Sequence, residues 1–274
     1  MPTCYRHPDR PTRISCVRCG RPICPDCMHP ASVGFQCPEE IADARRTVRA
    51  PKRTTGVRVA GRRWGVVTVV LVALNLAVAV GTAVSALLVG GNPISSFSSP
   101  LQSELLTAPV LVDAGQWWRV VTSAFTHAGV VHLALNMLAL LLFGSELERT
   151  IGKARYLTVY LVSALGGAAA LQLFGEYLGG VVGASGAIYG LLGAFGVVLV
   201  KQKQDLRGLL TLLAINLVIS FLPGVSLLGH LGGLVAGAAT AAVLLWARRR
   251  TALAVAGVAA VVVVLLVLTF GGIR

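Results

Sequence analysis

The sequence predicts an all-α polytopic membrane protein of seven transmembrane helices, preceded by a small cysteine-rich module. Apolar residues make up 55% of the 274 residues, whereas charged residues make up only 13%. Several apolar runs are as long as the roughly 20 residues that a helix needs to cross a bilayer. All six cysteines lie within the first 37 residues, so they belong to one local structure.

Residues 1–43 form the cysteine-rich module and predict zinc binding. Three pairs of Cys-x-x-Cys or Cys-x-x-His spacing follow one another, and this spacing lets two side chains reach one ion from a tight turn. Eight candidate ligands are enough for two tetrahedral ions and leave no position open for a catalytic water, which favours a structural role. These ligands are Cys4, His7, Cys16, Cys19, Cys24, Cys27, His29 and Cys37.

Alternatives to this ligand set stay open. His29 is equally compatible with an ordinary surface histidine, and Asp26 is a possible substitute ligand. Disulfides fit poorly, because the module precedes a basic segment and is expected in the reducing cytoplasm. The pattern resembles a B-box-type zinc finger, and the resemblance implies two cross-braced ions. One ion would be shared by Cys4, His7, Cys24 and Cys27, and the other by Cys16, Cys19, His29 and Cys37.

Residues 44–63 form a basic linker with eight Lys or Arg residues and no Asp or Glu. The net charge of +13 raises the alternative of nucleic-acid binding. The linker, however, lacks the aromatic residues on which bases stack. We therefore expect no nucleic-acid partner and predict that the linker touches anionic lipid beside the first membrane span.

Residues 64–250 carry six predicted spans, and residues 251–274 add an extra C-terminal helix. The segment 90–129, between the first two spans, contains three prolines and few charges, so we expect it to lie partly in the outer membrane interface. The predicted spans are 64–89, 130–147, 156–174, 185–200, 206–222, 228–246 and 252–270.

The distribution of basic residues predicts the orientation of these spans. With the linker inside and the spans alternating, every inner connection is basic, and the outer side keeps Arg119 and the terminal Arg274. Seven spans thus satisfy the positive-inside rule, with the N-terminus cytoplasmic and the C-terminus outside. The inner basic residues are Arg149, Lys153, Arg155, Lys201, Lys203, Arg207, Arg248, Arg249 and Arg250.

Polar side chains converge near the outer face in this topology. Ser185 opens the fourth span, and His230 lies at the same depth in the sixth. His132 and Asn136, four residues apart on one helical face, lie in the outer part of the second span. Such groups are costly in a membrane unless they meet each other or water. This convergence favours a catalytic site around Ser185, in which His132 and Asn136 could donate hydrogen bonds to an oxyanion.

Glycines at four-residue spacing make contact between the fourth and sixth spans plausible. Gly186 and Gly190 lie on the fourth, and Gly229, Gly233 and Gly237 on the sixth. Small residues at this spacing let two helix backbones approach closely. Taken singly, Ser185, His132 and Asn136 are more typical of ordinary contacts between helices, and the glycines would pack helices in either case. The prediction therefore depends on their convergence.

These motifs together resemble the rhomboid family of intramembrane serine proteases. The matching pieces are Gly183-Ala184-Ser185-Gly186 for the nucleophile, Gly-His-Leu-Gly-Gly around His230 for the base, His132-x-x-x-Asn136 for the oxyanion, and Trp118-Arg119 in the first outer loop. The resemblance covers about residues 64–250. It departs from the family pattern before His230, where the entry to the span is one residue longer.

The resemblance implies an intramembrane serine endopeptidase that uses a Ser185–His230 dyad without an aspartate and needs no cofactor for catalysis. It also implies that the ring of Tyr189, one turn after Ser185, packs against His230 as a supporting group. Substrates would be transmembrane proteins whose helices unwind near the outer face, and the enzyme is expected in the plasma membrane of a prokaryote. A protein partner for the zinc module is a further expectation.

Two other functions remain as alternatives. A catalytically inactive rhomboid-like protein would bind membrane clients without cutting them, but such proteins typically lack the serine or the histidine. A transporter or channel would spread polar residues across the bilayer, whereas here they gather near one face.

Overall fold

The computed structural model describes residues 1–47, 63–94, 96–221, 224–247 and 249–272. The chain divides into two compact units, one within residues 1–54 and the other within residues 55–274. Most of the predicted basic linker lies outside the described residues, as do Arg248 and Arg274.

The N-terminal unit is a small fold built around its cysteines. It contains a 3₁₀ turn, η1 (Pro25–Cys27), an antiparallel pair of short strands, β1 (His29–Pro30) and β2 (Phe35–Gln36), and helix α1 (Pro38–Thr47). Its core consists of Ile23 and five buried cysteines. Ion pairs from Arg18 to Glu40 and from Arg21 to Glu39 connect the cysteine loops to the start of α1. An apolar core this small contributes little to the free energy of unfolding, so we expect the fold of this unit to depend on its cysteine cluster.

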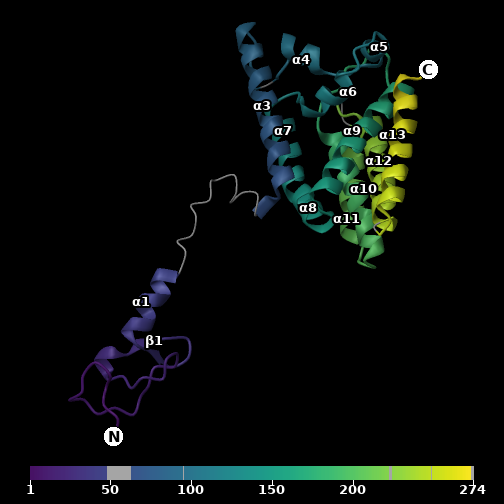
Figure 1. Cartoon of the computed structure of the whole chain (residues 1–274). Helices are drawn as coiled ribbons and strands as arrows, with labels where there is room; N and C mark the ends of the chain where they lie inside the picture. Colours follow the sequence, from purple (N-terminus) through teal and green to yellow (C-terminus); the bar gives the residue numbers. More distant parts are fainter. Residues whose placement is uncertain (48–62, 95, 222–223, 248, 273–274) are drawn as a thin grey trace. The chain divides into compact units, whose positions relative to one another are not determined.

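The second unit is a bundle of apolar helices that stand side by side (Figure 1), as the sequence predicts. Five helical segments are long and apolar enough to cross a membrane: α3 (Val66–Leu88), the combined segment Val130–Ile151, α9 (Lys153–Phe174), α12 (Leu227–Trp246) and α13 (Thr251–Phe270). Two shorter apolar helices, α10 (Ser185–Lys201) and α11 (Arg207–Ile219), complete the predicted set of seven in the part of the chain that the structure describes. The protein is therefore a multi-pass membrane protein.

The second span differs from its predicted form at its end. It starts as α7 (Val130–Ala139), passes through a π-helical turn, η3 (Leu140–Gly144), and continues as α8 (Ser145–Ile151). The helix therefore extends past the predicted end at residue 147 and buries Glu148, a residue that the sequence places in an inner loop. It ends at Gly152, whose φ of +86° suits a residue without a side chain.

Glu148 is buried because it binds the start of another helix. Its carboxylate accepts hydrogen bonds from the backbone N–H groups of Val67 and Thr68, at 3.0 and 2.8 Å, and from the Thr68 hydroxyl at 2.9 Å. The first N–H groups of a helix have no partner within the helix, so an acceptor here satisfies them. Gly65 leaves room for this contact, since a Cβ there would collide with the carboxylate. Glu148 thus fastens the start of α3 to α8.

The segment 90–129 is more structured than the predicted loop. It forms the short helices α4 (Pro100–Leu105), α5 (Pro109–Asp113) and α6 (Arg119–Thr122), followed by the 3₁₀ turn η2 (Ser123–Phe125). These helices gather at the end of the bundle where α13 also ends (Figure 1). Arg119 is buried and donates hydrogen bonds to the carbonyl oxygens of Ser103 and Leu106. One guanidinium group therefore ties α4 and the chain after it to α6.

Glycines bring α9, α10 and α12 into backbone contact. An added Cβ at Gly233 of α12 would collide with the carbonyl of Gly186 in α10, and one at Gly237 would collide with that of Gly190. A Cβ at Gly167 of α9 would lie 2.9 Å from the Gly229 carbonyl. The glycines therefore allow the close helix packing that the sequence predicts. This close packing lets short side chains on different helices meet.

Candidate active site and metal-ligand cluster

Ser185 is the first residue of α10, and the chain before it is held by the segment 90–129. Thr107 and Val181 exchange backbone hydrogen bonds, and the N–H of Gly183 donates to the carbonyl of Ser123 at 3.0 Å. Gly183 has a φ of +133°, a conformation that residues with a side chain rarely adopt. This turn presents the Ser185 side chain, which is half-buried, at the start of its helix.

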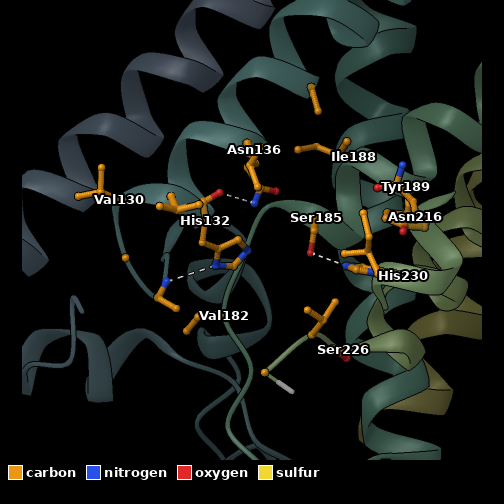
Figure 2. A pocket seen from close by; sticks show the side chains of 18 of the residues that line it. Val130, His132, Asn136, Val182, Ser185, Ile188, Tyr189, Asn216, Ser226 and His230 are labelled. Carbon is orange, nitrogen blue, oxygen red and sulfur yellow. Dashed lines mark hydrogen bonds between the residues drawn. The ribbon is translucent and has the colours of Figure 1, made fainter. Parts of the chain in front are cut away.

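His230 lies in the first turn of α12 and faces Ser185. The Ser226 hydroxyl caps this helix by accepting the N–H of Gly229 at 3.1 Å. The Nε2 atom of His230 lies 2.9 Å from the Ser185 Oγ, and the imidazole is buried (Figure 2). A serine and an imidazole from two helices are therefore within hydrogen-bond distance, which the nucleophile–base pair of a serine hydrolase requires.

Two further side chains hold the His230 ring. The ring of Tyr189 stacks on it, with centroids 4.0 Å apart and planes 9° apart. On the other edge, the Oγ of Ser220 lies 2.8 Å from Nδ1. Tyr189 is among the residues singled out from the sequence, whereas Ser220 is not. The only signal for Ser220 is that it is one of few polar residues in the apolar run 206–222.

His132 approaches Ser185 from the side opposite His230 in the view of Figure 2. The backbone N–H of Ala128 donates to its Nδ1 at 3.3 Å. In a neutral imidazole the other nitrogen then carries the proton, so Nε2–H is a hydrogen-bond donor. A Cβ at Gly183 would lie 3.0 Å from this Nε2 and 3.4 Å from the Ser185 Oγ. The missing side chain of Gly183 therefore keeps open the space between the histidine donor and the serine.

Asn136 lies one turn further along α7 and is buried. Its Nδ2 donates to the carbonyl of His132 in the same helix, at 2.9 Å. An amide nitrogen carries two protons, so one remains for a bound group. His132, Asn136, Ser185, Tyr189 and His230 all line one cavity of about 540 Å³. The structure thus brings together all five residues predicted for this site.

His127 is a buried histidine that the sequence reading did not single out. Its ring lies edge-on to His132, with centroids 5.2 Å apart, and neither ring nitrogen has a hydrogen-bond partner among the described residues. Burial, together with the charge that His132 carries when protonated, lowers the pKa of His127 to about 4. His127 is therefore neutral at physiological pH and packs behind His132.

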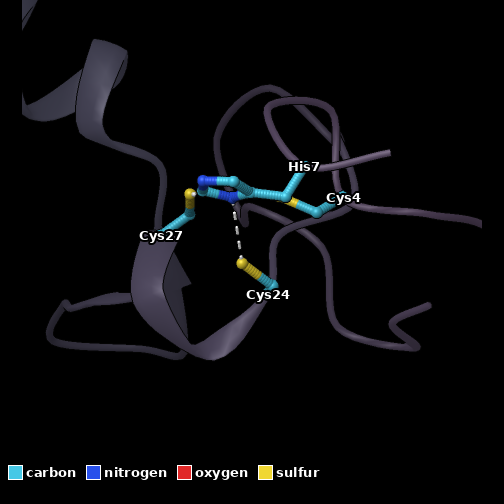
Figure 3. Close-up of side chains that lie close together, drawn as sticks. All are labelled: Cys4, His7, Cys24 and Cys27. Carbon is cyan, nitrogen blue, oxygen red and sulfur yellow. Dashed lines mark hydrogen bonds between the residues drawn. The ribbon is translucent and has the colours of Figure 1, made fainter. Parts of the chain in front are cut away.

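The cysteine-rich unit contains two groups of ligand side chains that could hold a metal ion. In the first, Cys4, His7, Cys24 and Cys27 direct their ligand atoms to one point (Figure 3), all within 4.8 Å of one another. The three sulfurs lie 3.8, 3.3 and 3.5 Å from Nδ1 of His7. Usual Zn–S and Zn–N bond lengths would separate tetrahedral sulfur and nitrogen ligands by roughly 3.6 Å. These four residues therefore fit a tetrahedral zinc ion.

The second group is Cys16, Cys19 and Cys37. The sulfurs of Cys19 and Cys37 are 3.7 Å apart, close to the roughly 3.8 Å that tetrahedral zinc would impose. His29, the predicted fourth ligand, does not belong to this group, and Asp26 is paired with Arg10. All six cysteines are free thiols in the structure, which therefore does not contain the disulfides of the alternative interpretation.

The fold and the site define a class: a helical multi-pass membrane protein with a serine–histidine pair near the ends of its helices. The model of the rhomboid domain matches residues 114–247. The putative rhomboid protease YdcA of Bacillus subtilis (strain 168) is 37% identical over 155 residues, which cover 52% of this chain and 77% of that relative. The chain belongs to the rhomboid family.

Other relatives are longer than the shared region. The rhomboid protease GluP of Bacillus subtilis (strain 168) is 39% identical over 140 residues, 49% of this chain and 27% of that protein. The RHOMBOID-like protein 6, mitochondrial, of Arabidopsis thaliana is 39% identical over 163 residues, 56% of this chain and 53% of that protein. The matches thus cover about a quarter to a half of these two relatives. The rhomboid-domain match, residues 114–247, contains His132, Asn136, Ser185, Tyr189 and His230.

Proposed function

We propose that this protein is an intramembrane serine endopeptidase that cleaves transmembrane segments of membrane proteins through a dyad of Ser185 and His230. The observation that carries the proposal is the 2.9 Å distance between the Ser185 Oγ and the His230 Nε2, across two helices. Relatives named as rhomboid proteases support the same assignment.

The first step of the proposed reaction is acylation of Ser185. His230 Nε2 takes the hydroxyl proton as Oγ attacks the carbonyl carbon of the substrate peptide, and a tetrahedral intermediate forms. The imidazolium then gives this proton to the leaving amine, and the peptide bond breaks. A water molecule, activated by the same nitrogen, hydrolyses the acyl-enzyme and returns the proton to Ser185.

The negative oxygen of the intermediate needs donors, and three are near. The His132 Nε2–H faces the space beside Ser185, and Asn136 keeps one amide proton free. Ser185 is the first residue of α10, and a helix leaves its first backbone N–H groups without internal partners. His132, Ser185 and His230 also lie within the first four residues of their helices, whose positive dipole ends favour an oxyanion.

The proposed orientation places this site near the outer face, with the zinc unit and the basic linker on the cytoplasmic side of a prokaryotic plasma membrane. The positive-inside distribution of the basic residues supports it. Substrates are then transmembrane proteins whose helices unwind within reach of water. The zinc unit is proposed to hold two structural ions and to contribute no catalytic group.

The test uses the purified full-length protein in liposomes with a fluorescent transmembrane substrate. We expect cleavage, and we expect Ser185→Ala to reduce its rate by about 10⁴-fold or more, because the nucleophile is lost. A fluorophosphonate probe should label wild type, and mass spectrometry should locate the label on Ser185. Intact substrate together with an unlabelled, folded wild type would support the alternative, an inactive client-binding member of the family.

A further inference from the structure

Ser220 touches the nitrogen of His230 that faces away from Ser185. It is the residue that follows α11, and it is only 3% exposed. Its Oγ lies 2.8 Å from Nδ1 of His230. We propose that Ser220 is a positioning residue that sets which nitrogen of His230 carries the proton. The proposal rests on the proposed dyad function and adds a third member to it.

The number of protons on Ser220 decides the direction of this hydrogen bond. The Ser220 hydroxyl has one proton, and its Oγ also lies 2.8 Å from the backbone carbonyl of Asn216, to which it donates. A carbonyl oxygen can only accept, so this bond uses the one proton that Ser220 has. Ser220 therefore meets Nδ1 as an acceptor, and Nδ1 carries the proton. The Nε2 lone pair then points at Ser185.

The opposite arrangement would disable the pair. If Ser220 donated to Nδ1, the Asn216 carbonyl would lose this donor and the imidazole proton would lie on Nε2. A protonated Nε2 faces the Ser185 Oγ at 2.9 Å and cannot accept its proton. The backbone bond to Asn216 thus selects the tautomer that can act as a base.

Tyr189 reinforces this arrangement. Its hydroxyl lies 3.3 Å from the Ser220 Oγ, and its ring stacks on His230. Because the Ser220 proton is already used, the phenol is the donor in this contact. The Ser220 oxygen therefore accepts from both Tyr189 and His230, and it remains a hydrogen-bond acceptor when His230 becomes a cation during acylation.

Ser220 takes the place that a carboxylate occupies in a serine–histidine–aspartate triad. None of the described residues that line the cavity is an aspartate or a glutamate. A neutral hydroxyl oxygen stabilises an imidazolium less than a carboxylate does, so its main effect is to orient the ring and select its tautomer. The expected contribution is correspondingly smaller than that of a triad aspartate.

The test compares Ser220→Ala and Ser220→Thr with wild type in the liposome cleavage assay, with thermal unfolding as a check of folding. We expect Ser220→Ala to lower kcat by about 10- to 100-fold with KM unchanged, because the base loses its orientation but the substrate site is intact. Ser220→Thr retains the hydroxyl and should restore most of kcat. Thr211→Ala is the matched control, because Thr211 makes the same backbone bond within α11, to Arg207, without touching His230.

The outcomes separate this inference from the proposed function. A wild type that cleaves, together with Ser220→Ala at a kcat within twofold of it, would overturn the positioning role and leave the dyad in place. An equal loss in Ser220→Ala and Thr211→Ala would also overturn it, since the effect would then be structural. A folded wild type that neither cleaves nor reacts with the fluorophosphonate would overturn both proposals.

Discussion

The two units of this protein assemble their chemistry in different ways. In the cysteine-rich unit, the first ligand group comes from residues 4 to 27, and neighbouring ligands lie three residues apart on tight turns. In the membrane bundle, Ser185 and His230 are 45 residues apart and meet only because two helices pack closely. The first arrangement depends on local spacing and, in the proposed function, on a bound metal ion. The second depends on glycines that let helix backbones touch.

The comparison implies that the two units lose their structure independently. Each should respond to a perturbation that leaves the other intact. All six cysteines lie in the first unit and the proposed nucleophile in the second, so thiol alkylation and serine labelling report on them separately.

Removal of the metal should have the largest effect. A strong chelator is expected to unfold the cysteine-rich unit, because such small metal domains draw about 10 kcal/mol or more of folding free energy from the ion. Mass spectrometry after alkylation should then find all six thiols modified, against few in the zinc-loaded protein. Fluorophosphonate labelling of Ser185 should stay unchanged. Equal alkylation with and without chelator would contradict the zinc assignment.

The reverse experiment is Gly233→Ala. The added methyl group would collide with the Gly186 carbonyl and push α12 away from α10. A displacement of about 1 Å at reacting groups can cost about 100-fold in rate, so we expect a loss of that size in Ser185 labelling. The thiols should remain protected. Gly208→Ala is the control, because a Cβ there meets no atom within 4 Å. Wild-type labelling in Gly233→Ala would show that the helix contact does not set the site.

Glu148→Ala tests the stability of the bundle alone. The substitution leaves two N–H groups at the start of α3 without an acceptor, which should lower the free energy of unfolding by about 2 kcal/mol. Thermal unfolding in detergent measures this effect. Glu146→Ala is the matched control, since Glu146 is exposed and its ion pair with Arg149 is worth little. Identical unfolding of the two variants would argue against the proposed cap.

His29→Ala should have the smallest effect. Because His29 does not belong to either ligand group, we expect the zinc content to stay at about two ions per chain in elemental analysis. His7→Ala, which removes a ligand of the first group, should lower it to about one. A loss of one ion in His29→Ala would restore His29 to the second site, as the resemblance to a B-box-type zinc finger implies.

Much of the fold could be predicted from sequence because its signals are local. The apolar runs predict seven membrane helices, and the family and its multi-pass fold agree with that prediction. The sequence predicts the end of the second span too early, at residue 147 instead of Ile151, because Glu148 looks like the start of a polar loop. The burial of Glu148 depends on the N–H groups of Val67 and Thr68, which lie 81 and 80 residues away and have no sequence signal.

The candidate active site likewise contains residues that the sequence predicts and one that it does not. Ser185, His230, His132 and Asn136 could be selected together because each lies near the same end of an apolar run. Ser220 could not, since a serine near the end of an apolar helix has no distinguishing pattern. Its contact with His230 depends on where α11 ends relative to α12.

The amino-acid sequence by itself determined which segments are apolar enough to enter a membrane, which cysteines and histidines lie close enough along the chain to share an ion, and which polar residues reach one level of the bundle. These properties follow from composition and short-range spacing. The tertiary structure alone decided that Ser185 faces Nε2 of His230, that Ser220 holds Nδ1, and that Gly183 leaves room beside His132. Hydrogen bonds form only within a few tenths of an ångström of their preferred distance, and that accuracy comes from the packing of whole helices.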